Sequence, residues 1–544
     1  MSQQKYIIVT GGVLSGIGKG IAAASIGHLL AGNGLKVLPI KCDGYLNVDP
    51  GTMNPIEHGE VYVLDDGGEV DMDFGHYERF LGCTSKITWN LTMGKVFDDV
   101  RIKERRGDYL GKTVQYIPHV TNAIKERFFT VAHEEQPDVI LIEIGGTVGD
   151  MENDLYVEAI RQLKKDVGME NILYVHVTYV PIPSGVNEQK SKPTQQSVNL
   201  LRQRGIQPDV IIGRCREYLT PKIKNRISTF CDVPATAVIT GKDVRNIYEV
   251  PFIFAQEGIL NIINQKFGWH LEFKSPWGVY AQRLAKEQTP ITIAICGKYT
   301  DLEDSYASVV EALKHAGTHL EATPKIKWVE TTDIEEGILT VEQALQGIHG
   351  VIIPGGFGKR GAEGKIAVIK HCREKNLPFL GLCYGLQLAV IEYARNVCNL
   401  AKANSTEIDP ETPHPVIDLL PEQQFVYNKG GTMRLGGHTI EIRPETHAAT
   451  LFGGTVRLRF RHRYEVNPKY ILGLEQAGLV FSGKAPGKEI MQILELPNHP
   501  FFMATQAHPE LTSRLEQPDK LFYHFLQASM PKNLVPILER KIEE

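Results

Sequence analysis

Short apolar runs bounded by turn residues recur along the first half of the chain. One run, at residues 6–9, ends in a glycine-rich turn, and a helical apolar pattern extends from Ile21 to Leu30 before the next run at residues 36–40. A strand, a helix and a second strand in this order predict a βαβ unit, the start of a parallel sheet. Further buried strands are expected at residues 139–142, 172–177 and 210–212. Their continuous apolar character is typical of strands covered on both faces.

The alternation of strands and helices stops near residue 267 and starts again after residue 290. The intervening stretch contains Trp269 and Trp277, which predict a linker packed against the surface rather than a free tether. The pattern then predicts strands at 291–296, 325–329, 350–354 and 378–382, with helices at 305–315 and up to Lys375. The sequence therefore predicts two separately cored α/β domains, at residues 1–267 and 291–544, joined by a linker at 268–290.

The overall composition narrows the class of protein. A chain of 544 residues with 42% apolar and 23% charged residues is expected to form two or more globular domains. Its formal charge of -5 favours neither nucleic acid nor a membrane surface as a partner, and no apolar run is long enough to span a bilayer. The eight cysteines form no CxxC pair and no zinc-like group with histidine. A reduced, cytoplasmic location is therefore expected.

A glycine-rich segment at residues 11–20 lies between the first strand and the first helix. Backbone N–H groups at such a turn wrap a triphosphate, and Lys19 is placed to reach the outer phosphates. The spacing from Gly12 to Gly18 is one residue longer than in the usual phosphate loop, and Gly20 stands where a magnesium-binding hydroxyl is usual. The alternative is a glycine turn with a surface lysine.

Carboxylates are expected to supply the magnesium ligands that Gly20 cannot, because magnesium prefers oxygen ligands. Glu143 ends an apolar strand, at the sheet edge where open α/β folds bind ligands, and Asp73 lies in an acidic segment. Without the glycine loop, both would be read as solvated loop residues. A basic stretch at residues 190–195 could hold a second triphosphate, although such a sequence is usually a solvated loop.

The second half contains the pattern of a cysteine-dependent acyl transfer site. Cys383 lies between Gly381 and Gly385 at a strand-to-helix turn, the position of an exposed nucleophile. His508 is the expected base, and Glu510 is expected to orient its ring. The glycine loop at residues 354–358 and the N–H of Tyr384 are the expected oxyanion donors. The alternative is a buried structural cysteine. The elbow, the glycine loop and the His508–Glu510 pair, found together, speak against it.

The sequence resembles the CTP synthase family along essentially its whole length. The second half resembles the class I, or triad-type, glutamine amidotransferase domain, which many enzymes share. The first half carries the distinctive stretches, which are residues 47–53 (NVDPGTM), 75–80 (GHYERF), 104–111 (ERRGDYLG) and 143–150 (EIGGTVGD). The resemblance implies an amino-terminal P-loop-like parallel-sheet synthase domain and a carboxyl-terminal class I glutaminase domain.

The resemblance also implies a reaction. ATP phosphorylates O4 of UTP, and ammonia from glutamine, or free ammonia, displaces the phosphate to give CTP. Mg²⁺ is the implied metal, GTP the implied activator and CTP an inhibitor. Lys19 and Lys41 would stabilise the transferring phosphoryl group. The implied ATP contacts are Gly16, Ile17, Gly18, Lys19, Gly20, Ile21, Asp73, Lys242, Asp243 and Val244.

Further site residues follow from the resemblance. The implied magnesium ligands are Asp73 and Glu143. The implied UTP or CTP contacts are Ser15, Asp150, Met151, Glu152, Lys190, Ser191, Lys192, Pro193, Thr194, Gln195 and Arg226. The implied glutamine contacts around Cys383 are Gly356, Tyr384, Gly385, Leu386, Gln387, Glu407 and Arg463. His58 would lie at an ammonia channel, Arg360 is a candidate GTP contact, and the implied assembly is a homotetramer, in some members a filament.

Four positions depart from the commoner family pattern, namely Gly44, Arg226, Tyr384 and Ala507. None removes a catalytic group. Two other functions remain open. One is an ATP-dependent amidotransferase that amidates carboxyl groups of a large acid, which UTP-dependent ATPase activity would separate from a CTP synthase. The other is a filament or scaffold protein without turnover, against which the presence of every expected catalytic group speaks.

Overall fold

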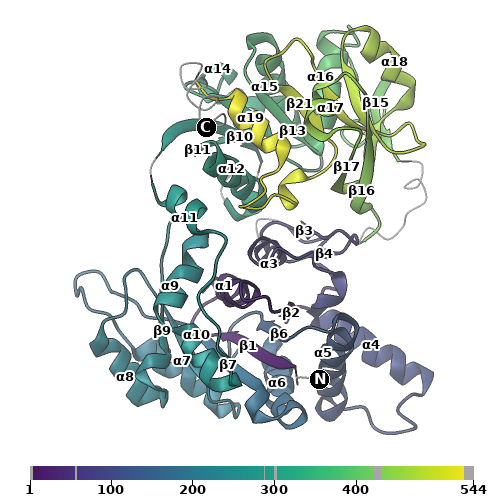
Figure 1. The fold of residues 1–544 in the computed structure, drawn as a ribbon. Coiled ribbons are helices and arrows are strands. Elements are labelled where there is room, and N and C mark those ends of the chain that lie inside the picture. The colour runs from purple at the N-terminus through teal and green to yellow at the C-terminus, as the bar shows by residue number, and fades with distance from the viewer. Residues whose placement is uncertain (1–3, 55–57, 287, 299–302, 421–430, 532–544) are drawn as a thin grey trace. The chain divides into compact units, whose positions relative to one another are not determined.

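The computed structural model describes residues 4–54, 58–286, 288–298, 303–420 and 431–531. The chain divides into two compact units (Figure 1). The first consists of Met1–Asp49 and His76–Ala281, and the second of Pro50–Gly75 and Gln282–Glu544. The short segment 50–75 therefore belongs with the second half of the chain.

The first unit contains a seven-stranded sheet in the order β5-β2-β6-β1-β7-β8-β9, and all of its neighbouring strands are parallel. The strands are β1 (Lys5–Gly11), β2 (Val37–Asp43), β5 (Asn90–Thr92), β6 (Val139–Ile144), β7 (Ile172–Tyr179), β8 (Val210–Cys215) and β9 (Val238–Lys242). Every predicted strand of this half is confirmed. The chain leaves β1 toward β2 on one side, while β7, β8 and β9 extend the sheet on the other. The carboxyl end of β1 therefore lies where strand order reverses, the usual ligand position in open α/β sheets.

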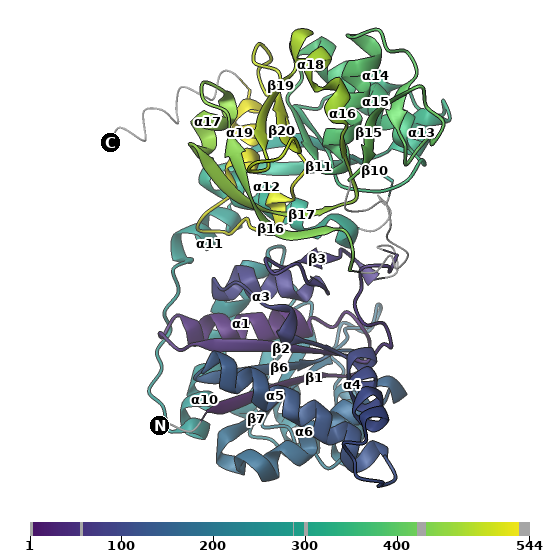
Figure 2. The same ribbon diagram turned by 90° about the vertical axis from the view of Figure 1, so that its right-hand side faces the viewer.

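Helices cover both faces of this sheet, as its apolar strands require. The helix α1 (Lys19–Ala31) lies on one face, and α5 (Thr121–Glu135) and α6 (Asp154–Val167) lie on the other (Figure 2). The remaining longer helices are α3 (Asp73–Leu81), assigned at its first residues to the second unit, α4 (Met93–Arg106), α7 (Lys192–Gln203), α8 (Pro221–Cys231), α9 (Val250–Gln256) and α10 (Ile259–Phe267). The predicted helix after the glycine turn is confirmed, and Gly32 caps its end.

The predicted linker is packed where the structure describes it. Trp277 is fully buried and stacks on His28 with ring centroids 3.8 Å apart, while Phe80 meets it edge-on at 4.9 Å. Trp269 is partly buried and lies against Phe267. The linker also forms α11 (Gly278–Ala285), a helix that the sequence interpretation did not include. Glu287 lies outside the described residues.

The second unit contains a nine-stranded mixed sheet in the order β11-β10-β12-β13-β21-β20-β19-β16-β17. Its parallel part consists of β11 (Ala322–Glu330), β10 (Thr289–Gly297), β12 (Gly350–Ile353), β13 (Phe379–Leu382) and β21 (Phe502–Thr505). The antiparallel part adds β20 (Met491–Glu495), β19 (Val480–Lys484), β16 (Arg434–Ile442) and β17 (Thr455–His462). The main helices are α12 (Ala307–His319), α15 (Ala362–Lys375), α16 (Tyr384–Asn396) and α19 (Lys520–Ala528). The prediction of two α/β domains is confirmed.

A hairpin from early in the chain completes the second unit. Its strands are β3 (Tyr62–Val63) and β4 (Glu69–Val70). The Tyr62 hydroxyl donates to Leu511 O over 2.6 Å, and Arg457 pairs with Asp65 at 2.8 Å. The hairpin is thus held to the rest of the second unit through specific polar contacts.

Within the described ranges, no helix is both long and apolar enough to cross a membrane. All eight cysteines lie in these ranges, and each is a free thiol.

Candidate active sites

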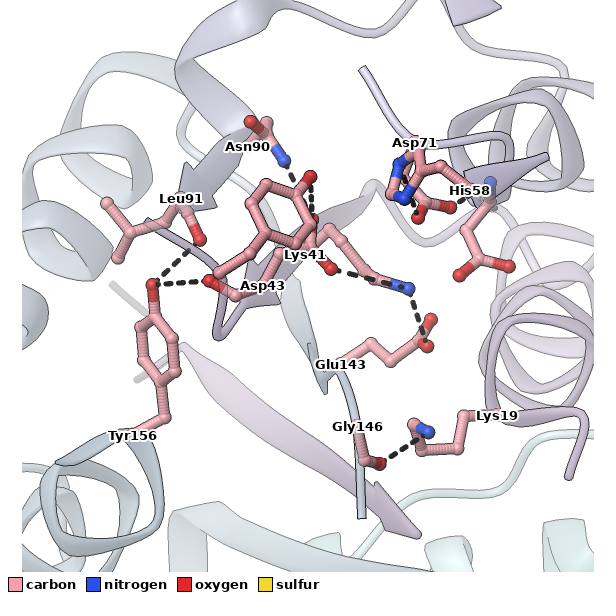
Figure 3. Close-up of polar contacts among 12 residues, drawn as sticks. Lys19, Lys41, Asp43, His58, Asp71, Asn90, Leu91, Glu143, Gly146 and Tyr156 are labelled. Atoms are coloured by element: carbon pink, nitrogen blue, oxygen red, sulfur yellow. Dashed lines mark hydrogen bonds and ion pairs between the residues drawn. The ribbon is translucent and has the colours of Figure 1, made fainter. Parts of the chain in front are cut away.

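The glycine loop of the first unit follows β1 directly and has an unusual backbone. Val13, Gly16 and Gly18 have φ angles of 81°, 67° and 91°, the left-handed region that turns successive N–H groups toward one side. Lys19 opens α1 and is buried, and its Nζ donates to Gly146 O over 2.7 Å (Figure 3). The loop therefore turns sharply at three positions before α1, and Lys19 is folded against the segment that follows β6.

A pocket beside this loop brings together residues that are distant in sequence. Ile17, Gly18 and Ile21 line it with Lys242, Asp243 and Val244, the segment that the family resemblance assigns to the ATP base. Arg214, which the sequence interpretation missed, connects the glycine loop to the segment 242–244. Its guanidinium donates to Gly16 O over 3.0 Å and to the Asp243 carboxylate over 2.9 Å. Its position at the carboxyl end of β8 is the signal that could have identified it.

Glu143 lies in a buried polar cluster at the carboxyl ends of β2 and β6 (Figure 3). Lys41 Nζ lies 3.0 Å from Glu143 Oε1 and 3.9 Å from Asp43 Oδ1, and the Tyr77 hydroxyl donates to Glu143 Oε2. Sequence reasoning missed Asp43 and Tyr77, although Asp43 ends a strand at the same sheet edge. Two buried carboxylates at one sheet edge fit the chemistry of a magnesium site, because magnesium prefers carboxylate oxygens as ligands.

The second predicted magnesium ligand, Asp73, begins α3 and is assigned to the other unit. Its backbone N–H donates to Asp71 Oδ1 over 2.9 Å, and Asp71 also pairs with His58, whose Nε2 is 3.5 Å away. Among the described residues, no group of three or more His, Cys, Asp or Glu side chains forms a ready metal site. The role of Asp73 therefore stays a prediction.

The basic stretch at 190–195 is the start of a helix rather than a solvated loop. Ser191 is the N-cap of α7, and Pro193 occupies its first turn, a position that suits proline. Lys190, Lys192, Gln195 and Arg226 line one pocket with Ser191. This geometry combines basic side chains with the positive end of a helix, which favours an anionic ligand.

Of the other predicted UTP contacts, Ser15 is exposed in the glycine loop, and Asp150, Met151 and Glu152 lie at a short turn. Asp150 caps the turn Met151–Asn153, in which Met151 and Glu152 are exposed. The departure at Gly44 has a steric reason in this turn. A Cβ at Gly44 would lie 2.5 Å from Asn153 Oδ1 and 3.0 Å from Glu152.

Cys383 adopts the strained conformation predicted for a nucleophile. Its φ is 51° and its ψ is -97°, between β13 and α16. Small neighbours are required on both sides. A Cβ at Gly381 would lie 2.8 Å from that of Ala504, and one at Gly385 would lie 2.4 Å from Ile353 O. Such strain is held only where surrounding structure enforces it, and it is characteristic of catalytic nucleophiles.

His508 and Glu510 form the expected acid–base pair. His508 Nδ1 lies 2.6 Å from Glu510 Oε1, and Glu510 is 3% exposed. Burial lowers the pKa of His508, but the charge of Glu510 and the neighbouring Cys383 outweigh it and raise this pKa to about 10. The imidazole is therefore tuned to hold a proton taken from the thiol.

The glycine loop after β12 packs directly beside the pair. A Cβ at Gly355 would lie 2.8 Å from His508 Cε1 and 3.8 Å from Cys383 Cβ. Gly358 N donates to Glu407 Oε1 over 2.8 Å, so this amide is engaged by Glu407. Burial raises the pKa of Glu407. Tyr384, at its departure from the family pattern, donates from its hydroxyl to Gly358 O over 2.7 Å, which ties the residue after the nucleophile to the loop.

One pocket of the second unit contains these groups. Cys383, His508 and the loop residues Gly355 and Gly356 line it with Arg463. Segment 51–54, Phe357 and Arg360 line the same pocket, and Arg461 lies 5.2 Å from the Phe357 ring centroid. The amide of Gln387 is instead directed inward, where it donates to Tyr464 O over 2.9 Å.

A buried lysine beneath the loop was not foreseen. Lys365 is fully buried on α15, with Nζ 5.2 Å from the Tyr384 ring centroid and no hydrogen-bond partner among the described residues. Burial lowers its pKa to about 7, and the charge of Lys298 acts in the same direction. Nothing in the sequence distinguishes Lys365 from the surface lysines of the same helix.

Comparisons with known proteins identify a family for each half of the chain. Residues 5–269 match the family described as "CTP synthase N-terminus", and residues 301–528 match "Glutamine amidotransferase class-I". The CTP synthase of Archaeoglobus fulgidus is 52% identical over 528 residues, which is 97% of this chain and 98% of that protein. The CTP synthase of Borreliella burgdorferi is 49% identical over 533 residues, or 96% and 99% of the two chains.

A solved structure also matches the second half. The glutaminase domain of Trypanosoma brucei CTPS with bound acivicin is 34% identical, with a TM-score of 0.41, and the match covers 44% of this chain and 93% of that one. The class I match defines the second half, which contains the Cys383 elbow, as a glutamine amidotransferase domain, and the first half is a parallel-sheet domain that matches the CTP synthase N-terminus. These relatives are about 50% identical to the chain and match nearly its whole length. The chain therefore belongs to the CTP synthase family, a family of glutamine-dependent ligases.

Proposed function

We propose that this chain converts UTP to CTP with ATP, using ammonia released from glutamine or supplied free, through UTP phosphorylated at O4. The observation that carries the proposal is the pairing of a glycine-loop nucleotide pocket in one unit with a cysteine elbow in the other. The match to CTP synthases over nearly the whole chain supports the choice of UTP as acceptor.

In the glutaminase half, Cys383 attacks the amide carbon of glutamine. His508 takes the thiol proton and returns it to the departing ammonia, and Glu510 holds the ring and stabilises its positive charge. The N–H groups of Gly355 and Gly356 and the N–H of Tyr384 stabilise the oxyanion, while the N–H of Gly358 is held by Glu407. Arg463, which lines the pocket, suits the substrate carboxylate, and Glu407 suits its ammonium.

In the synthase half, the glycine loop holds the ATP phosphates and Lys242–Val244 the base. Lys19 and Lys41 stabilise the charge of the phosphoryl group as it passes to UTP. Residues 190–195 and Arg226 hold the UTP triphosphate, supported by their shared pocket at the start of α7. Ammonia then displaces phosphate at C4.

Magnesium, when bound, would neutralise charge on the ATP phosphates. Glu143 and the predicted ligand Asp73 would supply oxygen ligands, and Asp43 is a further candidate beside Glu143. GTP activation, with Arg360 as a contact, and CTP inhibition at the UTP pocket belong to the same proposal. A role of His58 in ammonia passage and a cytoplasmic location stay predictions.

We propose self-association into homotetramers, with filaments as a higher assembly. Leu110, Tyr116 and Ile117 are 87%, 66% and 52% exposed in one short stretch. A grouping of large apolar side chains at a surface favours burial against another protein surface, and a second copy of the chain is the partner that the family implies.

An absorbance assay for CTP formation tests the proposal. Pure protein with UTP, ATP and magnesium should form CTP with glutamine or with ammonia, and GTP should raise only the glutamine-dependent rate. ATP hydrolysis that does not depend on UTP would favour a carboxyl-amidating enzyme. The absence of turnover at saturating substrates would favour a scaffold protein.

A further inference from the structure

A continuous chain of buried hydrogen bonds joins β1, β7 and α7 below the glycine loop. His176 on β7 is fully buried, with Nδ1 2.9 Å from Thr10 Oγ1 and Nε2 2.7 Å from Ser197 Oγ. Thr10 and Ser197 are 2% and 3% exposed. Thr10 is the residue directly before the loop, and Ser197 lies on α7, two residues after Gln195.

The contacts define the direction of each bond. The Thr10 hydroxyl donates to Val175 O over 3.3 Å, so its oxygen accepts from His176 Nδ1–H. Nε2 is then left to accept from the Ser197 hydroxyl, because a neutral imidazole has one donor and one acceptor. Burial lowers the pKa of His176 to about 3, with the charge of Lys19 acting in the same direction. The ring is therefore neutral and serves as a fixed spacer rather than a proton carrier.

The loop backbone rests directly on this chain. A Cβ at Gly12 would lie 1.6 Å from Ser197 Oγ and 3.2 Å from His176 Nε2. Gly12 N also donates to Val177 O over 3.0 Å. The backbone of Gly12, at the start of the glycine loop, is thus packed directly against the side chain of Ser197 on α7.

We propose that His176 is a positioning residue that sets the separation between the glycine loop and the start of α7, and thereby aligns the two nucleotides for phosphoryl transfer. This inference rests on the proposed function, which places ATP on the loop and UTP at residues 190–195. A change in this separation should affect the rate of phosphoryl transfer more than the affinity for either nucleotide, because a misplacement of about 1 Å can lower a rate by about 10²-fold.

The test uses Ser197→Ala, which removes one bond of the chain and adds no bulk. We expect the kcat for CTP formation with free ammonia to fall by about 10-fold, with the KM values for ATP and UTP within about two-fold, since positioning acts on the transition state. Thr178→Val is the matched control. Thr178 lies on the same strand face as His176, is fully buried and has no hydrogen-bond partner for its hydroxyl among the described residues.

A compensation experiment tests the contact itself. Gly12→Ala should abolish synthesis because of the clash with Ser197, and Gly12→Ala with Ser197→Gly should regain part of it. The positioning role is refuted if Ser197→Ala keeps the kcat of Thr178→Val, if it changes KM instead, or if glutamate release falls equally. A wild-type protein that makes no CTP from ammonia would instead refute the proposed function.

Discussion

Glu510→Gln is the sharpest perturbation of the glutaminase half because it removes one charge and keeps the shape. At 2.6 Å and an effective dielectric constant of about 20, the attraction between Glu510 and a His508 imidazolium is at most about 6 kcal/mol. Since about 1.4 kcal/mol corresponds to a factor of ten, this ceiling is about 10⁴-fold in the population of protonated His508. Burial disfavours the protonated form of His508, and without Glu510 one of the interactions that offset this effect is lost.

We therefore expect Glu510→Gln to lower the kcat for glutamate release by about 10²- to 10⁴-fold. The assay measures glutamate from glutamine and, in parallel, CTP from free ammonia, which should be unchanged. Glu489→Gln, at an exposed position of the same unit, is the control for charge removal. A variant that keeps more than half of the wild-type glutaminase rate would show that Glu510 does not support His508 in this way.

Three further predictions concern single residues. Cys383→Ala should abolish glutamine-dependent synthesis and keep ammonia-dependent synthesis, because the thiol acts only in ammonia release; equal loss of both rates would show another role. Lys19→Ala should reduce synthesis by at least about 10²-fold with either nitrogen source, and near-normal rates with ammonia would remove Lys19 from the phosphoryl step. The pKa of Lys365 is lowered to about 7, so its burial costs stability that grows as the pH falls from about 10 to 7, reaching on the order of 4 kcal/mol. Lys365→Met should therefore raise the thermal midpoint at pH 7 and leave it nearly unchanged at pH 10, whereas Lys375→Met, at an exposed position, should change it little at either pH. A lower midpoint of Lys365→Met at pH 7 would contradict a lowered pKa of the buried amine.

The strands were predictable because both faces of each sheet are covered, which leaves a plain apolar run in the sequence. The Cys383 elbow was predictable for a related reason, since only small residues at Gly381 and Gly385 fit against Ala504 and Ile353. Helix α11 was missed because its eight residues, which begin with Gly278 two positions after Pro276, are too few to give a clear periodic pattern. Residues 190–195 were left open between a triphosphate site and a solvated loop, and the helix that begins there was not predicted, although Pro193 suits a first helical turn.

Other features depend on contacts that no local pattern records. Arg461 reaches back to Glu69 at 2.7 Å, across 392 positions of the chain, so the placement of segment 50–75 with the second unit is invisible in sequence. Lys365 and His176 are ordinary residues in the sequence, and only tertiary packing makes one a buried amine and the other a spacer. Arg214 lies at the end of a predictable strand, but its contacts with Gly16 and Asp243 become visible only in the folded chain.

The central claim is that O4 of UTP is phosphorylated before nitrogen replaces it. The most direct measurement starts from UTP carrying heavy oxygen at O4, with ATP, magnesium and free ammonia, and analyses the released inorganic phosphate by mass spectrometry. The account predicts one heavy oxygen in each phosphate for each CTP formed. Unlabelled phosphate alongside CTP would contradict it.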